Sequence, residues 1–274
     1  MLRATILFAV GIAASVLLGL PAMAQAPAEL TLTRIDCGTG AIPTNVNERF
    51  SDTFAFKGLS LTFTFSCYLI KHGNEYMVWD TGFAPGSNPN APKVALADYL
   101  SQVNVKPEQV KYVGISHFHG DHTGQLAPFT SATLLIGKGD WDGLTATPPM
   151  QGAKVAGFKQ WIEEKRKVEA LPNDKDVFGD GSVLVLRTPG HTPGHQALLV
   201  RLKDKGAVLL TGDLFHFREN YDSSGQPWFN YDRAQTSASM DRFKALAKNL
   251  SATVIIQHDR RDIDKLPAFP AAAK

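Results

Sequence analysis

The hydrophobic pattern of this chain changes from one long apolar run at the N-terminus to short segments with the spacing of strands and helices. Residues 4–20 are almost entirely apolar. From residue 30 onward, short runs rich in Val, Ile, Leu, Thr and Phe alternate with turn residues, which is typical of β-strands. The predicted strands cover residues 30–37, 61–71, 76–79, 110–115, 132–136, 182–187, 197–202, 207–210 and 252–256.

Helical spacing occurs between and after these strands. The predicted helices cover residues 94–103, a segment from Asp140, residues 155–168 and residues 237–250. The last of them is amphipathic. Strands in two groups with helices between and after them fit two packed sheets with helices outside, an α+β architecture. We expect a single domain over residues 25–274, because no linker-like stretch divides it.

The first 24 residues have the pattern of a signal peptide. Arg3 gives a short basic start, the apolar run follows, and Ala22-Met23-Ala24 offers the small-x-small pattern of a cleavage site. The run is close to the minimum length for crossing a bilayer, so an uncleaved anchor is the alternative. We expect export with cleavage, which predicts a periplasmic or secreted protein.

Charge and cysteine content limit the partners and the compartment. The formal net charge is +2 and there is no basic tract, which argues against nucleic acid as a partner. No second apolar run is long enough for stable membrane insertion. Cys37 and Cys67 both lie in apolar, strand-like runs. In an oxidising compartment they could form a disulfide, or each could be a small buried thiol.

The strongest chemical signal is the sequence Ser-His-Phe-His-Gly-Asp-His at 116–122. It places His117, His119, Asp121 and His122 directly after an apolar run, although the whole chain has only 8 histidines. Imidazole and carboxylate are groups that bind zinc and similar divalent metals. The spacing is too tight for a helical pair of ligands and suits a loop at a strand end. The motif predicts a metal site with two metals, and therefore an enzyme.

Three further segments share this arrangement, in which a short apolar strand ends at a ligand-type residue. They lead to His191, Asp213 and His258. Glycine and proline near His191 and Asp213 allow the backbone to turn sharply beside a crowded site. Asp80 follows a predicted strand and could either orient a ligand histidine or cap a turn. We expect His195 to be structural or to support a ligand.

Together these residues make the chain resemble the metallo-β-lactamase superfamily over essentially the whole mature length. The resemblance implies an αβ/βα sandwich with a dinuclear site at one edge of the two mixed sheets. It implies two divalent metal ions, with Zn²⁺ the expected metal. The resemblance rests on Asp80-Thr81-Gly82 and on the seven ligand-type residues. It implies that His117, His119 and His191 bind the first metal and that Asp121, His122 and His258 bind the second. Asp213 would bridge the two metals.

Within the superfamily, the chain most resembles the N-acyl-homoserine lactonases, which are quorum-quenching enzymes. The similar stretches are residues 36–38, 66–70, 188–195 and 257–259. Those lactonases commonly have a tyrosine three residues after the bridging aspartate, where this chain has His216. A histidine can also donate a hydrogen bond to an oxyanion. Alternatively, His216 packs among its phenylalanine neighbours and has no catalytic role.

The expected function is an exported dinuclear hydrolase that opens the lactone ring of N-acyl-homoserine lactones. A metal-bridging hydroxide would attack the carbonyl, His216 would stabilise the oxyanion, and Asp121 would carry a proton to the leaving oxygen. The exposed aromatic loops could also serve a homodimer. Candidates for the apolar acyl channel are Phe50, Phe54, Phe56, Phe215, Phe217, Tyr221, Trp228, Phe229 and Tyr231.

Other functions remain open at this point. An exported organophosphate hydrolase similar to methyl parathion hydrolase would share the signal and the dinuclear site. Some sulfur dioxygenases use the same scaffold with iron, and would make the chain an oxidoreductase. A metal-binding module without turnover is disfavoured, because no ligand of the pattern is missing.

Overall fold

The computed structural model describes residues 1–2 and 28–274. Apart from Met1 and Leu2, the predicted signal at residues 1–24 lies outside the described residues, and its export role stays a prediction. Within the described ranges, no helix combines the length and the apolar character needed to cross a membrane.

The regular elements follow the predicted order closely. The strands are β1 (Leu30–Thr39), β2 (Thr44–Asn45), β3 (Ser60–Leu61), β4 (Thr64–His72), β5 (Glu75–Trp79), β6 (Val110–Gly114), β7 (Thr133–Gly137), β8 (Val168–Leu171), β9 (Lys175–Asp176), β10 (Val183–Arg187), β11 (Gln196–Leu202), β12 (Gly206–Leu210) and β13 (Thr253–Ile255). The α-helices are α1 (Val46–Arg49), α2 (Leu96–Gln102), α3 (Gly120–Thr123), α4 (Lys138–Thr145), α5 (Lys159–Ile162), α6 (Arg218–Ser223) and α7 (Arg233–Asn249). The 3₁₀ turns are η1 (Pro107–Gln109), η2 (Val155–Phe158), η3 (Gly212–Leu214) and η4 (Arg260–Lys265).

Two mixed sheets form the centre of the molecule. The first has the strand order β1-β4-β5-β6-β7-β8 and the second β13-β12-β11-β10-β9. β5, β6, β7 and β8 run parallel to one another, as do β12 and β13. β2 and β3 form a separate small hairpin that carries α1.

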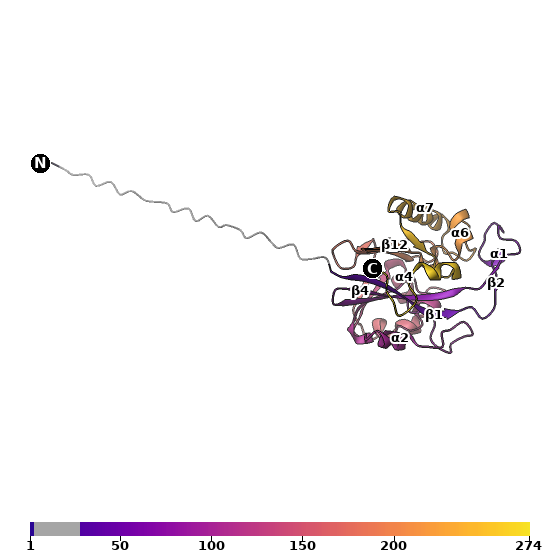
Figure 1. Ribbon diagram of the computed structural model, residues 1–274, viewed down its shortest axis with the longest axis horizontal. Helices are drawn as coiled ribbons and strands as arrows, with labels where there is room; N and C mark the ends of the chain where they lie inside the picture. The colour runs from indigo at the N-terminus through magenta and orange to yellow at the C-terminus, as the bar shows by residue number, and fades with distance from the viewer. Residues whose placement is uncertain (3–27) are drawn as a thin grey trace.

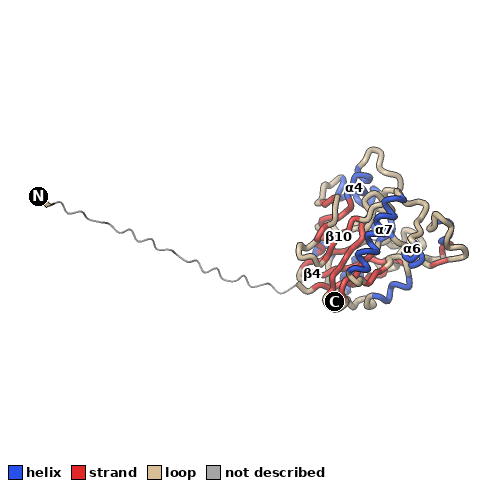
Figure 2. The backbone as a smooth tube through the Cα atoms, turned by 90° about the horizontal axis from the view of Figure 1, so that it is seen from above, coloured by secondary structure: helices blue, strands red, loops and turns tan. Residues whose placement is uncertain are grey.

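Apolar side chains fill the space between the sheets and cover both outer faces. Met77 and Trp79 of the first sheet belong to the same buried cluster as Leu198 of the second. α2, α4 and α5 pack on the outer face of the first sheet, and α7 packs on the second sheet through Met240 and Phe243. Figure 1 shows α7 and α2 on opposite sides of the strands, and Figure 2 shows α7 lying across the second sheet. The predicted αβ/βα sandwich is confirmed.

The segment predicted as a helix over residues 155–168 differs from that prediction. It forms only η2 and the single turn α5, and the chain then enters β8 at Val168. Lys165 adopts a left-handed φ of 53°, which a continuing helix does not allow. The amphipathic helix near the C-terminus, in contrast, starts earlier than predicted, because the Asp232 side chain accepts the Gln235 N–H and caps it.

The two cysteines form a disulfide, which decides between the two readings of the sequence. Cys37 on β1 and Cys67 on β4 have Cα atoms 5.8 Å apart and are fully buried. The bond joins the neighbouring strands β1 and β4. Gly82 packs directly on Cys37, and a Cβ at this glycine would lie 2.5 Å from the Cys37 Cβ.

Candidate metal centre

The ligand-type side chains predicted from the sequence gather where the strand ends of the two sheets meet. The parallel strands β5, β6 and β7 place the loops after their carboxyl ends at one edge of the first sheet. Loops after β10, β12 and β13 lie at the facing edge of the second sheet. The residues carried by these loops are Asp80, His117, His119, Asp121, His122, His191, Asp213 and His258.

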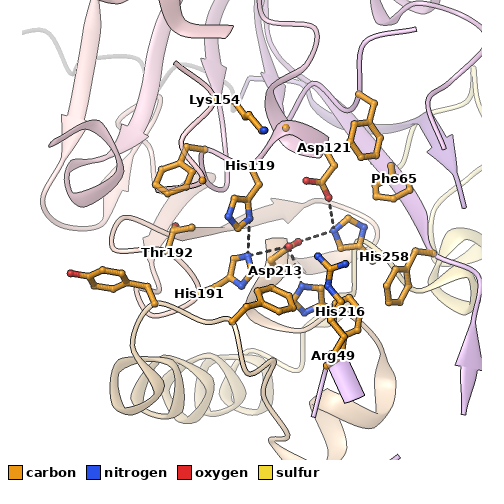
Figure 3. A pocket seen from close by; sticks show the side chains of 18 of the residues that line it. Arg49, Phe65, His119, Asp121, Lys154, His191, Thr192, Asp213, His216 and His258 are labelled. Carbon is orange, nitrogen blue, oxygen red and sulfur yellow. Dashed lines mark hydrogen bonds and ion pairs between the residues drawn. The ribbon is translucent and has the colours of Figure 1, made fainter. Parts of the chain in front are cut away.

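The structure divides the seven predicted ligands into two groups that share Asp213. Within each group the ligand atoms all lie within 4.8 Å of one another. One group is His117, His119, His191 and Asp213, and the other is Asp121, His122, Asp213 and His258. Figure 3 shows His119 and His191 on one side of Asp213, and Asp121 and His258 on the other. This is the division that the resemblance implied.

The two carboxylate oxygens of Asp213 face different groups. Oδ2 lies 3.6 Å from Nε2 of His117 and 3.3 Å from Nε2 of His191. Oδ1 lies 3.1 Å from Nε2 of His122 and 2.8 Å from Nε2 of His258. A carboxylate that offers one oxygen to each group is suited to bridge two cations.

Asp121 completes the second group and is its most accessible member. Its Oδ2 lies 3.4 Å from Nε2 of His122 and 3.6 Å from Nε2 of His258. The Asp121 side chain is 22% exposed, whereas that of Asp213 is 5% exposed. Asp121 can therefore contact a ligand in the cavity while it faces the metal group.

Hydrogen bonds on the outer side of the histidine rings hold them in place. Nδ1 of His122 lies 2.8 Å from Asp80 Oδ2, and Nδ1 of His191 lies 2.8 Å from Asn230 Oδ1. Nδ1 of His258 lies 2.8 Å from the Thr64 carbonyl oxygen. A ring that donates from Nδ1 presents an unprotonated Nε2 on its inner side, which is the form that binds a metal.

The inner donor atoms fit divalent cations. Nδ1 of His119 lies 2.8 Å from Nε2 of His117 and 3.1 Å from Nε2 of His191. Such closely spaced nitrogen lone pairs repel one another unless a proton or a cation lies between them. The set of five imidazoles and two carboxylates suits zinc and other first-row divalent metals.

The electrostatics of the two groups differ. Burial lowers the pKa of His119 to about 3 and that of His117 well below its usual value, so both rings are neutral near pH 7. Burial acts in the same direction on His258, but the Asp213 carboxylate outweighs it and raises the His258 pKa. His258 in turn helps to hold the pKa of Asp213 well below its usual value, against burial. The second group, with Asp121, His122 and His258, therefore attracts positive charge more strongly than the first.

His216 lies beside the metal groups but belongs to neither. Its Nε2 is 3.1 Å from Asp213 Oδ2, and its buried Nδ1 has no hydrogen-bond partner among the described residues. Burial lowers the His216 pKa to about 4, so the ring is neutral at pH 7. The ring contacts Phe50 and Phe229 at centroid distances of 4.9 and 6.1 Å. It faces the cavity rather than packing between Phe215 and Phe217, which are buried in the core.

Two histidines outside the groups have other roles. His195 accepts the Asp213 N–H at Nε2 over 2.9 Å, in agreement with the structural role expected for it. His72, the last residue of β4, stacks on Phe178 and pairs with Asp180 over 2.7 Å. The β9–β10 hairpin packs over the end of β4, a contact that a local sequence pattern cannot reveal.

Three residues that support the metal groups were not identified from the sequence. Asn230 and Ser116 hydrogen-bond to histidine rings, and Asp140 hydrogen-bonds to the loops that carry them. Ser116 Oγ lies 3.0 Å from Nδ1 of His117. Asp140 accepts hydrogen bonds from the two loops that carry the histidines of the first group, through Phe118 N–H and Thr192 Oγ1. Asp140 follows β7 in the same way that the ligands follow their strands, and that position was the available signal.

A cavity of about 940 Å³ opens onto the two groups. Of the predicted acyl-channel aromatics, it is lined by Phe50, Trp228, Phe229 and Tyr231. The remaining candidates do not line it: Phe54 is exposed, and Phe56, Phe215, Phe217 and Tyr221 pack elsewhere. Apolar lining residues that were not predicted are Phe63, Phe65, Phe83, Phe118 and Met150. The size is in the range of small-molecule sites.

The chain is similar to N-acyl homoserine lactonases. The chain is 32% identical over 181 residues to N-acyl homoserine lactonase AttM of Rhizobium radiobacter, which covers 64% of this chain and 68% of that protein. It is 28% identical over 227 residues to an N-acyl homoserine lactonase of Bacillus cereus, covering 74% and 84%. The predicted similarity to this group of metal-dependent hydrolases is confirmed.

Solved structures agree on the fold. An N-acyl homoserine lactone hydrolase, crystallised with the product N-hexanoyl-L-homoserine at its catalytic metal centre, superposes with a TM-score of 0.75. It is 22% identical, and the match covers 90% of this chain and 99% of that one. The family model of the metallo-beta-lactamase superfamily matches residues 65–258, a range that contains both metal groups. The chain therefore belongs to the metallo-β-lactamase superfamily.

Proposed function

We propose that this protein is a dinuclear metal-dependent hydrolase that opens the lactone ring of N-acyl-homoserine lactones, and thereby quenches quorum signals. The observation that carries the proposal is the position of Asp213, with one oxygen toward each group of histidines, at the floor of an aromatic cavity. The lactonases to which the chain is similar support the substrate class. We propose Zn²⁺ as the native metal because imidazole-rich sites with carboxylates suit it.

The seven ligands would hold two divalent cations, in the two groups described above. When bound, these cations supply Lewis acidity toward the lactone carbonyl and a nucleophile from water at neutral pH. The protein keeps the ligand set rigid, because the outer ring nitrogens are fixed by Asp80, Asn230 and the Thr64 carbonyl.

His216 and Asp121 are the residues that would act on the substrate directly. A neutral His216 with its proton on Nε2 would donate a hydrogen bond to the carbonyl oxygen as negative charge develops on it. Asp121, ionised and open to the cavity, would accept the proton of the attacking water. It would then return that proton to the ring oxygen as the acyl C–O bond breaks, which yields the N-acyl-homoserine.

We also propose that residues 1–24 direct export and that the mature protein is periplasmic or secreted. The buried Cys37–Cys67 disulfide supports this proposal, because such bonds persist mainly in oxidising compartments. N-terminal sequencing of the protein recovered from the periplasm or the medium tests it. A chain that starts at Met1 and stays in the cytoplasm would contradict it.

The decisive assay follows the acid released from N-hexanoyl-homoserine lactone, beside a thioester, a β-lactam and a phosphotriester. We expect release from the lactone with two equivalents of zinc per chain in protein purified without added metal. Release from the phosphotriester alone would instead assign an organophosphate hydrolase. One redox-active iron per chain and no lactone turnover would contradict the hydrolase proposal.

A further inference from the structure

Two basic side chains line the cavity from opposite sides. Arg49 comes from α1, at the tip of the β2–β3 hairpin, and Lys154 lies just before η2. Figure 3 shows Arg49 rising beside His216 and His258, and Lys154 on the far side of Asp121. Neither residue belongs to the metal groups, and the proposed lactone chemistry uses neither of them.

The Arg49 guanidinium is held by aromatic faces rather than by an acid. Its Cζ lies 5.3 Å from the ring centroid of Phe229 and 5.8 Å from that of Phe50. The Phe229 ring in turn lies 5.8 Å from the ring of His191. Stacking on aromatic rings orients a guanidinium and leaves its N–H groups free to bind a ligand at the edges.

The cavity holds no carboxylate that could neutralise these two cations. Asp121 and Asp213 are the only acidic residues that line it, and both pair with histidines of the metal groups. No ion pair joins Arg49 or Lys154 to any acidic residue of the described part of the chain. Two divalent cations at the metal groups would add further positive charge. The cavity is therefore a site of positive potential with apolar walls.

We propose that Arg49 is the anchor of an anion subsite, so that the enzyme prefers acylated lactones whose acyl chain ends in a carboxylate. The proposal rests on the function proposed above and names its substrate class. The aromatic walls would contact the methylene groups of the chain, and the guanidinium would bind the terminal carboxylate by charge-assisted hydrogen bonds. Lys154 would add to the attraction from the other side of the cavity, without direct pairing.

A matched pair of substrates tests this subsite. One is N-hexanoyl-homoserine lactone, and the other is a homoserine lactone acylated with adipic acid, which has the same chain length and ends in a carboxylate. We expect kcat/KM for the adipoyl compound to exceed that for the hexanoyl compound by about tenfold. Arg49→Gln should bring the ratio close to one, mainly through KM, and Arg49→Lys should restore part of it. A higher salt concentration should reduce the ratio in the wild type.

Lys248→Gln is the matched control, because Lys248 is an exposed lysine of α7 that lines no cavity. It should leave the ratio unchanged. A ratio of one in the wild type, or equal losses on both substrates in Arg49→Gln, would overturn the anion subsite while leaving the lactonase function intact. If neither lactone is hydrolysed, the proposed function fails. The subsite is then judged from calorimetric binding of adipate, which Arg49→Gln must weaken.

Discussion

Asp80 Oδ2 lies 2.8 Å from Nδ1 of His122, and both side chains are completely buried. Because the carboxylate accepts the Nδ1 proton, the ring turns its Nε2 toward Asp213, 3.1 Å away. The same carboxylate accepts hydrogen bonds from the Ser116 N–H and the Gln257 side chain. Of the two readings of Asp80 in the sequence, the structure supports the one in which it orients a ligand histidine.

Asp80→Ala should weaken metal binding at the second group before it affects the first. The substitution leaves the His122, Ser116 and Gln257 donors without an acceptor in a buried place. Loss of such an outer partner typically costs about 10–100-fold in metal affinity or activity. Competition with a chelator measures the affinity. Asp241→Asn, at an exposed carboxylate on α7, is the control, and an unchanged affinity in Asp80→Ala would remove the assigned role.

Asp213→Asn should lower the occupancy of both groups together. The amide keeps the shape of the side chain, but it loses the charge and turns an NH₂ group toward one set of histidines. We expect less than one metal per chain after dialysis, and a loss of lactone turnover greater than the roughly 100-fold upper end typical of outer partners. Loss of one metal with retention of the other would show that Asp213 serves a single group.

His216 variants separate oxyanion stabilisation from metal binding. His216→Phe removes the donor and keeps a ring in place, so turnover of lactones should fall by about 10²–10³ with the metal content unchanged. His216→Tyr restores a donor and should recover part of the rate. Steady-state kinetics and metal analysis on the same samples give the lactone turnover and the metal content. A Phe variant with full activity would reduce His216 to a packing residue.

The disulfide should contribute to stability by limiting the unfolded chain. Its loop of 30 residues corresponds to about 3–4 kcal/mol in the chain-entropy model. The double substitution Cys37→Ala with Cys67→Ala should lower the free energy of unfolding by about this amount, and it should raise the urea m-value because the unfolded chain expands. Urea titrations of the two proteins measure both quantities, and equal stabilities would contradict the expectation.

The metal ligands could be predicted because each follows a short apolar strand, and parallel strands bring such ends to one edge. That Asp213 bridges the two groups was implied by the family resemblance and not by the strand pattern, because the directions of its two oxygens depend on the rotamers of side chains far apart in the sequence. The contact of Thr64 with His258 could not be predicted either, because Thr64 acts through its backbone carbonyl. Phe63 and Phe65 lie on strand-like sequence, and only the packing of the two sheets decides that they line the cavity.

Asp140 is a buried acid without a charged partner among the described residues. It accepts hydrogen bonds from the Phe118 N–H, the Thr192 hydroxyl and the Gly194 N–H at 3.2, 2.9 and 2.7 Å. Burial nevertheless raises its pKa to about 7, outweighing these bonds. In the unfolded chain the carboxyl titrates near its usual pKa of about 3.9. The folded state therefore holds a proton that the unfolded state releases between about pH 4 and pH 7.

The sign of the pH effect follows from this difference in bound protons. Stability due to Asp140 is complete below about pH 4 and is lost as the pH rises toward 7, by at most about 1.4 kcal/mol per pH unit. Asp140→Asn cannot titrate, so the stability advantage of the wild type over the variant should be larger at low pH than at high pH. Urea unfolding of both proteins at about pH 4.5 and pH 7.5, with a chelator present throughout, measures this difference. An advantage that grows with pH would mean that the carboxylate is ionised in the fold, and that its three hydrogen bonds outweigh burial.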